Sequence, residues 1–209
     1  MNHAGPTVFV VDDAPAVLKS LSRLLRSARF DVATFSSSRE FLERHDPSAP
    51  GCLALDVAMP GLNGLELQEA LAAKGSELPI IFLTGHGDIP MSVQAMKRGA
   101  VDFLTKPVND EDLLKAIHVA IEKDRLQRQT RAEVAEIQQR LATLTPRERE
   151  VMEHVISGQL NKQTAADLGT VEKTIKVHRA RVMEKMKVQS VAELVRLAER
   201  AGVGVKSNQ

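Results

Sequence analysis

Five short, mostly apolar runs lie in the first half of the chain, at residues 8–11, 32–35, 52–55, 80–83 and 101–104. Such runs are typical of strands that are buried on both faces of a sheet. Between them, apolar residues recur with the spacing of an α-helix, over residues 16–28, 38–45, 64–73, 90–98 and from 110 onward. This alternation predicts a parallel sheet that helices cover on both faces.

Polar residues stand where these predicted strands end. Asp12 and Asp13 follow the first run, Asp56 follows the third, Thr84 follows the fourth, and Lys106 lies just beyond the fifth. The carboxyl ends of parallel strands meet at one edge of a sheet, which is where ligands bind in such folds. We therefore expect the aspartates, the hydroxyl and the ammonium to share one crevice.

These groups have the chemistry needed to accept and hold a phosphoryl group. The carboxylate of Asp56 is the candidate nucleophile, which would form an acyl phosphate. Asp12, Asp13 and Asp56 offer oxygen ligands of the kind that Mg²⁺ prefers. Thr84 and Lys106 would donate to the remaining phosphoryl oxygens. Taken singly, each residue is more typical of a helix cap, a loop or a solvated surface, so the hypothesis depends on their joint order.

The helical pattern that begins at residue 110 contains neither proline nor glycine as far as residue 144. Residues 122–133 are nearly all polar, which predicts a solvated helical linker. Val134, Ile137, Leu141 and Leu144 recur at intervals of 3, 4 and 3 residues, as in a short coiled-coil seam. The pattern leaves open whether the linker is a single helix or pairs with a second copy of itself.

A new domain is predicted after the linker. Thr145 can cap a helix, Pro146 fits its first position, and Glu148 completes a capping box. Helices are expected over residues 146–157, 162–168, 171–186 and 191–201, which makes a small all-α module. The tight turn at Gly169 and Thr170 is typical of a helix-turn-helix, whose second helix can enter the major groove of DNA.

The charge of the chain changes sign between its two parts. Residues 1–124 hold 12 Lys and Arg against 17 Asp and Glu, whereas residues 125–209 hold 16 against 10. The second predicted helix of the turn motif is especially basic, while Ile175, Val182 and Met186 on it are left to face a core. Its cations are Lys173, Lys176, Arg179, Arg181, Lys185 and Lys187. This distribution favours DNA as the partner of the second part.

Other classes of protein are disfavoured. No apolar stretch approaches the roughly 20 residues that span a bilayer, and no export signal is evident, so a cytoplasmic protein is expected. The single cysteine, Cys52, has no partner for an intrachain disulfide and is predicted to be core. A phosphatase with an aspartyl phosphate would need a second acid near Asp56, where the chain has Val57-Ala58-Met59, so only slow self-hydrolysis is expected. An adaptor that binds an acidic protein is the other alternative, and His86 is not favoured as a general base.

Four segments resemble the receiver domain of bacterial two-component response regulators: 10–13, 55–61, 83–86 and 103–107. The resemblance extends over residues 6–123 and implies a flavodoxin-like, doubly wound, five-stranded sheet. It implies that a sensor histidine kinase phosphorylates Asp56, and that Asp13, Asp56 and the carbonyl of Ala58 ligate Mg²⁺ with Asp12 nearby. It also implies a cis Lys106–Pro107 bond and a switch formed by Thr84 and Phe103.

The segments 144–151, 161–163 and 172–179 resemble a LuxR-type DNA-binding domain, so the whole chain resembles a response regulator of the FixJ/NarL type. The expected domains are a receiver (1–123), a helical linker (124–143) and a DNA-binding domain (144–209). The resemblance implies a phosphorylation-dependent transcriptional regulator of promoter DNA, with RNA polymerase as a further partner. Phosphorylation would act by pairing two molecules into a homodimer or by releasing a recognition helix that the receiver covers, and the sequence leaves both routes open. Thr164, where relatives have an apolar residue, and Ala180 depart from the pattern. The expected DNA contacts are Lys173, Thr174, Lys176 and Val177 in the groove, Lys162 and Arg179 at the backbone, and the basic Arg181.

Overall fold

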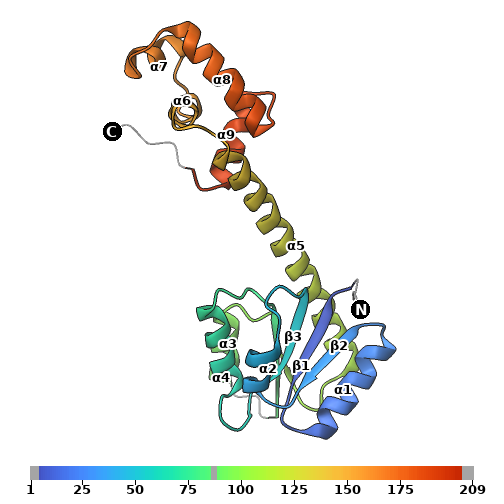
Figure 1. Ribbon diagram of the computed structural model, residues 1–209. Coiled ribbons are helices and arrows are strands. Elements are labelled where there is room, and N and C mark those ends of the chain that lie inside the picture. The colour runs from blue at the N-terminus through green and yellow to red at the C-terminus, as the bar shows by residue number, and fades with distance from the viewer. Residues whose placement is uncertain (1–4, 86–88, 204–209) are drawn as a thin grey trace. The chain divides into compact units, whose positions relative to one another are not determined.

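The computed structural model describes residues 5–85 and 89–203, and its contacts divide the chain into two units, 1–128 and 129–209 (Figure 1). The first unit contains a parallel sheet in the strand order β2-β1-β3-β4-β5. This order and the strand bounds confirm the predicted doubly wound sheet. The strands are β1 (Thr7–Val11), β2 (Asp31–Phe35), β3 (Gly51–Asp56), β4 (Ile80–Thr84) and β5 (Asp102–Thr105).

Helices cover both faces of this sheet, because the buried side chains of β1, β3 and β4 alternate between two separate hydrophobic clusters. On one face, Leu25 of α1 and Ile117 of α5 pack against the sheet. On the other face, Phe41 of α2, Leu67 of α3 and Ala95 of α4 do so. The helices are α1 (Pro15–Ser27), α2 (Ser38–Arg44), α3 (Gly64–Ala73), α4 (Ile89–Lys97) and α5 (Asp110–Ala142).

Cys52 lies in the central strand β3 and is completely buried, as the sequence predicted. Burial, with a smaller contribution from the negative charge of Asp124, raises the pKa of its thiol to about 12.

Helix α5 continues without interruption from Asp110 to Ala142, so the predicted helical linker is present as part of this helix. The side chain of Asn109 accepts from the main-chain N–H of Asp112 and caps its start. The boundary between the two units falls between Arg128 and Gln129, inside the segment that the sequence analysis predicted to be a linker. The limits proposed for the three functional domains stay a prediction.

The second unit has its own hydrophobic core, in which helices α6 to α9 pack together. Ile137 and Leu141 near the end of α5, and Leu144 just after it, are buried in this core. These residues of the suspected coiled-coil seam are thus used within the chain, which favours the single-helix reading of the linker. The helices are α6 (Pro146–Ile156), α7 (Asn161–Asp167), α8 (Glu172–Met186) and α9 (Val191–Arg200).

The predicted capping box at the start of α6 is confirmed. Thr145 and Glu148 each accept from the main-chain N–H of the other. In the part of the chain that the structure describes, no helix is long and apolar enough to cross a membrane.

Candidate functional site

Three aspartates gather at the carboxyl edge of the sheet, as their positions after the strands predicted. Asp12 directly follows β1 and Asp56 ends β3, and both are buried, whereas Asp13 is exposed. One carboxylate oxygen of each lies within 4.8 Å of the others. Asp12 is oriented from the start of α1, because its Oδ1 accepts from the main-chain N–H of Ala14 at 2.9 Å. Ala58, two residues after Asp56, is exposed beside this edge.

Lys106 joins the buried aspartates. It follows β5, and its Nζ donates to Asp12 Oδ2 at 2.6 Å and to Asp56 Oδ1 at 2.8 Å. Its main-chain N–H donates to the carbonyl of Thr84 at 2.7 Å, which ties this turn to the end of β4. The Lys106–Pro107 peptide bond is cis, as the resemblance implied. The turn therefore aims the ammonium at the carboxylates.

The electrostatics of this cluster favour an additional cation. Burial raises the pKa of Asp56 above its usual value, the hydrogen bond and charge of Lys106 oppose the rise, and the charges of Asp12 and Asp13 add to it. Burial alone would lower the pKa of Lys106, but its hydrogen bonds to Asp12 and Asp56 outweigh this and raise it. One ammonium thus faces three carboxylates. Carboxylate oxygens at this spacing suit a hard divalent cation, so the residues present fit a metal site.

Thr84 and Phe103 lie on neighbouring strands and on the same face of the sheet. Phe103 is in register with Phe82, and Thr84, two residues after Phe82, points to the same face. The rings of Phe82 and Phe103 have centroids 6.1 Å apart. Thr84 is buried at the aspartate edge, while Phe103 is partly buried against the cluster that α2, α3 and α4 cover. The switch role of this pair stays a prediction.

Gly64 contributes to the site in a way that the sequence analysis missed. It opens α3, and a Cβ atom at this position would overlap the carbonyl oxygen of Asp56. Its N–H donates to the carbonyl of Val57 at 3.0 Å. The sequence signal was only a glycine at a predicted helix start, which indicates no particular partner. The candidate base that the sequence disfavoured, His86, lies outside the described residues.

A second candidate site is the helix-turn-helix of α7 and α8. Gly169, with a φ of 61°, makes the turn, and Ile175, Val182 and Met186 of α8 face the core as predicted. The predicted DNA contacts remain on the surface of the two helices. Lys162, Lys173, Lys176, Val177 and Arg181 are exposed, while Thr174 and Arg179 are partly buried.

Two cations of α8 also contact the scaffold of the module. The Nη1 of Arg179 donates to Asn161 Oδ1 at the start of α7, at 3.1 Å. The Nζ of Lys185 lies 2.6 Å from Glu148 Oε2 and donates to the carbonyl of Thr143 at 3.0 Å. Lys185 was counted in the basic run, but these contacts assign it to the packing of α8 on α6. The exposed Lys176 pairs with Glu172 one turn before it, at 2.9 Å.

Comparison with known proteins separates the same two parts. Residues 8–118 match the response regulator receiver domain, and residues 142–198 match the bacterial regulatory proteins of the luxR family. The chain is 47% identical to Nodulation protein W of Bradyrhizobium diazoefficiens, over 97% of this chain and 89% of that protein. It is 45% identical to the transcriptional regulatory protein FixJ of the same organism, over 94% of this chain and 96% of that protein.

A solved structure is also similar over nearly the whole length. The response regulator StyR matches with a TM-score of 0.85 and 48% identity, over 94% of this chain and 100% of that chain.

Proposed function

Because the chain belongs to the two-component response regulators that join a receiver domain to a LuxR-type DNA-binding domain, we propose that Asp56 is its phosphoacceptor. The observation that carries this proposal is the contact of Lys106 with both Asp12 and Asp56 at the rim of the sheet. Asp56 accepts from the ammonium of Lys106 and lies beside the other two aspartates. A phosphoryl group on Asp56 would therefore lie within reach of both the ammonium and a metal ion held by these acids.

The transfer itself is a displacement at phosphorus. A carboxylate oxygen of Asp56 attacks the phosphoryl group on the kinase histidine, a P–O bond forms, and the P–N bond breaks. The imidazole leaves with the electron pair and takes up a proton. Lys106, already 2.8 Å from Asp56 Oδ1, is placed to stabilise negative charge on a phosphoryl oxygen. Water later cleaves the acyl phosphate slowly, because no second acid follows Asp56 to assist it.

The acidic cluster would hold Mg²⁺ through Asp13, Asp56 and the main-chain carbonyl of Ala58, with Asp12 beside them. When bound, the ion would neutralise the repulsion between the carboxylates and the incoming phosphoryl group. The donor set supports this assignment, because it consists of oxygen ligands on a rim with excess negative charge.

Phosphorylation would act on the receiver surface through Thr84 and Phe103. A hydroxyl that moves to donate to the phosphoryl group vacates space on the sheet face that it shares with the ring. The ring, which is only partly buried, can fill that space. A change of charge at the rim would thereby become a change of packing beside α4 and β5, from which pairing of two molecules would follow.

The second unit would bind promoter DNA in the bacterial cytoplasm through α8. Lys173, Thr174, Lys176 and Val177 would approach base edges in the major groove, since they lie on the first turns of α8. Positioning on the phosphate backbone would come from Lys162, Arg179 and Arg181. Paired modules would grip two half-sites, and RNA polymerase is the expected further partner.

Two measurements test this proposal. Acetyl phosphate with Mg²⁺ should label the wild-type chain, and Asp56→Asn should abolish the label. Footprints on promoter DNA should strengthen with phosphorylation in the wild type and stay unchanged in Asp56→Asn. Labelling that persists in Asp56→Asn would move the acceptor to another residue.

A further inference from the structure

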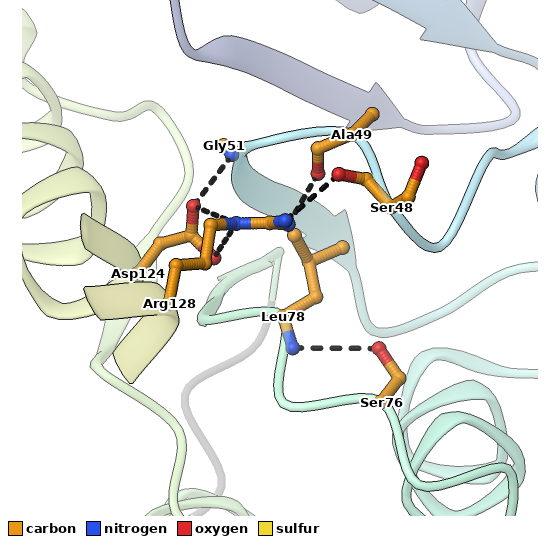
Figure 2. Close-up of polar contacts among 7 residues, drawn as sticks. All are labelled: Ser48, Ala49, Gly51, Ser76, Leu78, Asp124 and Arg128. Carbon is orange, nitrogen blue, oxygen red and sulfur yellow. Dashed lines mark hydrogen bonds and ion pairs between the residues drawn. The ribbon is translucent and has the colours of Figure 1, made fainter. Parts of the chain in front are cut away.

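A buried carboxylate and a guanidinium of α5 contact the first residue of β3 and the loop before it (Figure 2). Asp56 lies at the other end of this strand. Asp124 is 2% exposed although it lies in the polar part of α5. Its Oδ2 accepts from the main-chain N–H of Gly51 at 3.0 Å. Both of its oxygens accept from Nε of Arg128, one helical turn later, at 2.9 Å and 2.8 Å.

Arg128 extends this contact to the loop between α2 and β3. Its Nη1 donates to the carbonyl of Ser48 at 2.7 Å, and its Nη2 donates to the carbonyl of Ala49 at 2.6 Å. One planar guanidinium therefore binds a carboxylate and two carbonyls at once, as Figure 2 shows. We call the set Ser48, Ala49, Gly51, Asp124 and Arg128 the α5 clasp.

The clasp grips the strand that carries the phosphoacceptor candidate. Gly51 is the first residue of β3 and Asp56 is the last. A side chain at position 51 would overlap the carbonyl oxygen of Thr7, and φ there is 151°, so only glycine brings this amide so close to its neighbours. One strand is thus held by α5 at its amino end and by Lys106 at its carboxyl end.

Beyond Arg128 the helix buries little apolar surface until it reaches the second unit's core. Residues 129–136 are exposed except for the partly buried Val134, and burial resumes only at Ile137. Isolated helices shorter than roughly 12–15 residues are marginal in water. The exposed stretch therefore depends on anchors at both of its ends, and the clasp is the anchor on the receiver side.

We infer that Asp124 and Arg128 are positioning residues that keep α5 helical where it leaves the receiver. Through this ordered helix, phosphorylation of Asp56 would change the DNA affinity of the second unit. The coupling part of this inference rests on the proposed function. The anchoring part rests on the contacts alone. Exposed ion pairs contribute little, but here the carboxylate is buried and every contact is charge-assisted.

Substitution of Arg128 tests the anchor in the full-length chain. Arg128→Ala removes the guanidinium group. Arg128→Lys keeps the positive charge, but a single ammonium cannot contact the carboxylate and the two carbonyls together. Arg125→Ala is the matched control, because Arg125 lies in the same stretch of α5 and pairs with the exposed Glu122 one turn before it. Amide hydrogen exchange of residues 125–136 is the readout.

In both Arg128 variants the backbone amides of residues 125–136 should exchange roughly ten- to hundred-fold faster than in the wild type. This factor corresponds to the free energy lost with hydrogen bonds to charged groups. Exchange in β4 and in the first turns of α5 should stay close to wild type, as should the whole profile of Arg125→Ala. Wild-type protection in Arg128→Ala would overturn the anchor. Wild-type protection of these amides in Arg128→Lys would show that only the charge matters, and would overturn the proposed role of the planar guanidinium.

The coupling is measured as the ratio of promoter DNA affinities with and without phosphorylation. Coupling between sites typically amounts to roughly 5- to 150-fold. In Arg128→Ala the ratio should fall towards one, while the rate of Asp56 labelling and the unphosphorylated affinity stay unchanged, which a general loss of stability would not produce. A wild-type ratio retained by Arg128→Ala would overturn the coupling. A ratio of one in the wild type itself would instead refute the proposed function, and the exchange data would still decide the anchor.

Discussion

The Nζ of Lys185, near the end of α8, lies 2.6 Å from Oε2 of Glu148 in the first turn of α6, and the Glu148 side chain is only 3% exposed. Its hydrogen bonds with Lys185 and with the main chain of Thr145 lower the pKa of the Glu148 carboxyl to about 2. This ion pair fixes α8, the helix proposed to bind DNA, to α6, the first helix of the DNA-binding module.

The second unit should therefore lose stability in acid. The pKa of Glu148 is lower in the folded state than its ordinary value of 4.5, so the stabilisation is complete above pH 4.5 and is lost as the pH falls towards about 2. Acid unfolding followed on α6 and α8 amides checks this. In Glu148→Gln the pH-dependent loss over this range should be smaller, and stability at neutral pH should be lower by about 1.5–3 kcal/mol. An unchanged acid profile in that variant would contradict the assignment.

Thr164 should be a site where a more apolar residue stabilises the protein. It is 1% exposed in α7, and its hydroxyl has no hydrogen-bond partner among the described residues. Thr164→Val replaces this hydroxyl by a methyl group of similar size, so we expect a gain of about 1 kcal/mol. Thr164→Ser keeps the hydroxyl and should lose stability. Thermal melts of the two variants beside the wild type measure both effects, and a loss in the valine variant would show that the hydroxyl has a partner.

Gly64→Ala should disturb the phosphoacceptor without touching its side chain. The added methyl group would overlap the carbonyl oxygen of Asp56, so β3 or α3 must shift, at a cost of about 1–3 kcal/mol. Labelling by acetyl phosphate should slow. Gly5→Ala, whose added Cβ would make only an ordinary 3.8 Å contact, is the control and should label at the wild-type rate.

Lys106→Ala should separate phosphorylation from its consequence. The variant keeps all three aspartates of the cluster, Asp56 included, so labelling with Mg²⁺ should persist at a lower rate. It removes the ammonium that ties the phosphorylated strand to the turn after β5, so the gain in DNA affinity should be smaller. Gel-shift titrations of labelled protein measure this gain, and a wild-type response would remove Lys106 from the switch.

Lys162→Ala should weaken binding to all DNA sequences to a similar extent, because this exposed lysine of α7 is proposed to contact a phosphate. The slope of the logarithm of affinity against the logarithm of salt concentration should then fall by about 1. An altered preference among operator variants, with an unchanged slope, would contradict this assignment and indicate that Lys162 contacts a base edge. Lys19→Ala, which changes an exposed lysine of α1 in the first unit, should leave both quantities unchanged.

The parts of the fold that the sequence predicted depend on local periodicity and on strand ends. The apolar runs placed all five strands, and the rule that parallel strands end at one edge brought Asp12, Asp56 and Lys106 together. Residues 122–133, in contrast, were interpreted as having little to bury. Asp124 is buried because its partner is Gly51, which lies 73 residues earlier, and no local pattern indicates such a contact.

Long-range contacts that the sequence does not indicate also change the interpretation of the basic residues on α8. Six cations counted alike in the sequence, but Lys185 reaches a buried acid on α6 and Arg179 reaches an amide on α7. Helical position alone does not tell a cation held by its own domain from one presented to a ligand. The departure at Thr164 was visible in sequence, whereas the missing partner of its hydroxyl required the packing of α7.

Cys52 gives the receiver a built-in reporter. It is the only thiol in the chain, it is fully buried in β3, and its pKa of about 12 keeps it protonated at neutral pH. A thiol-directed dye therefore reacts only with molecules whose central strand has opened, since the thiolate is the reactive form. The rate of dye incorporation reads out the opening equilibrium of the phosphoacceptor strand in the unmodified protein, with no engineered label.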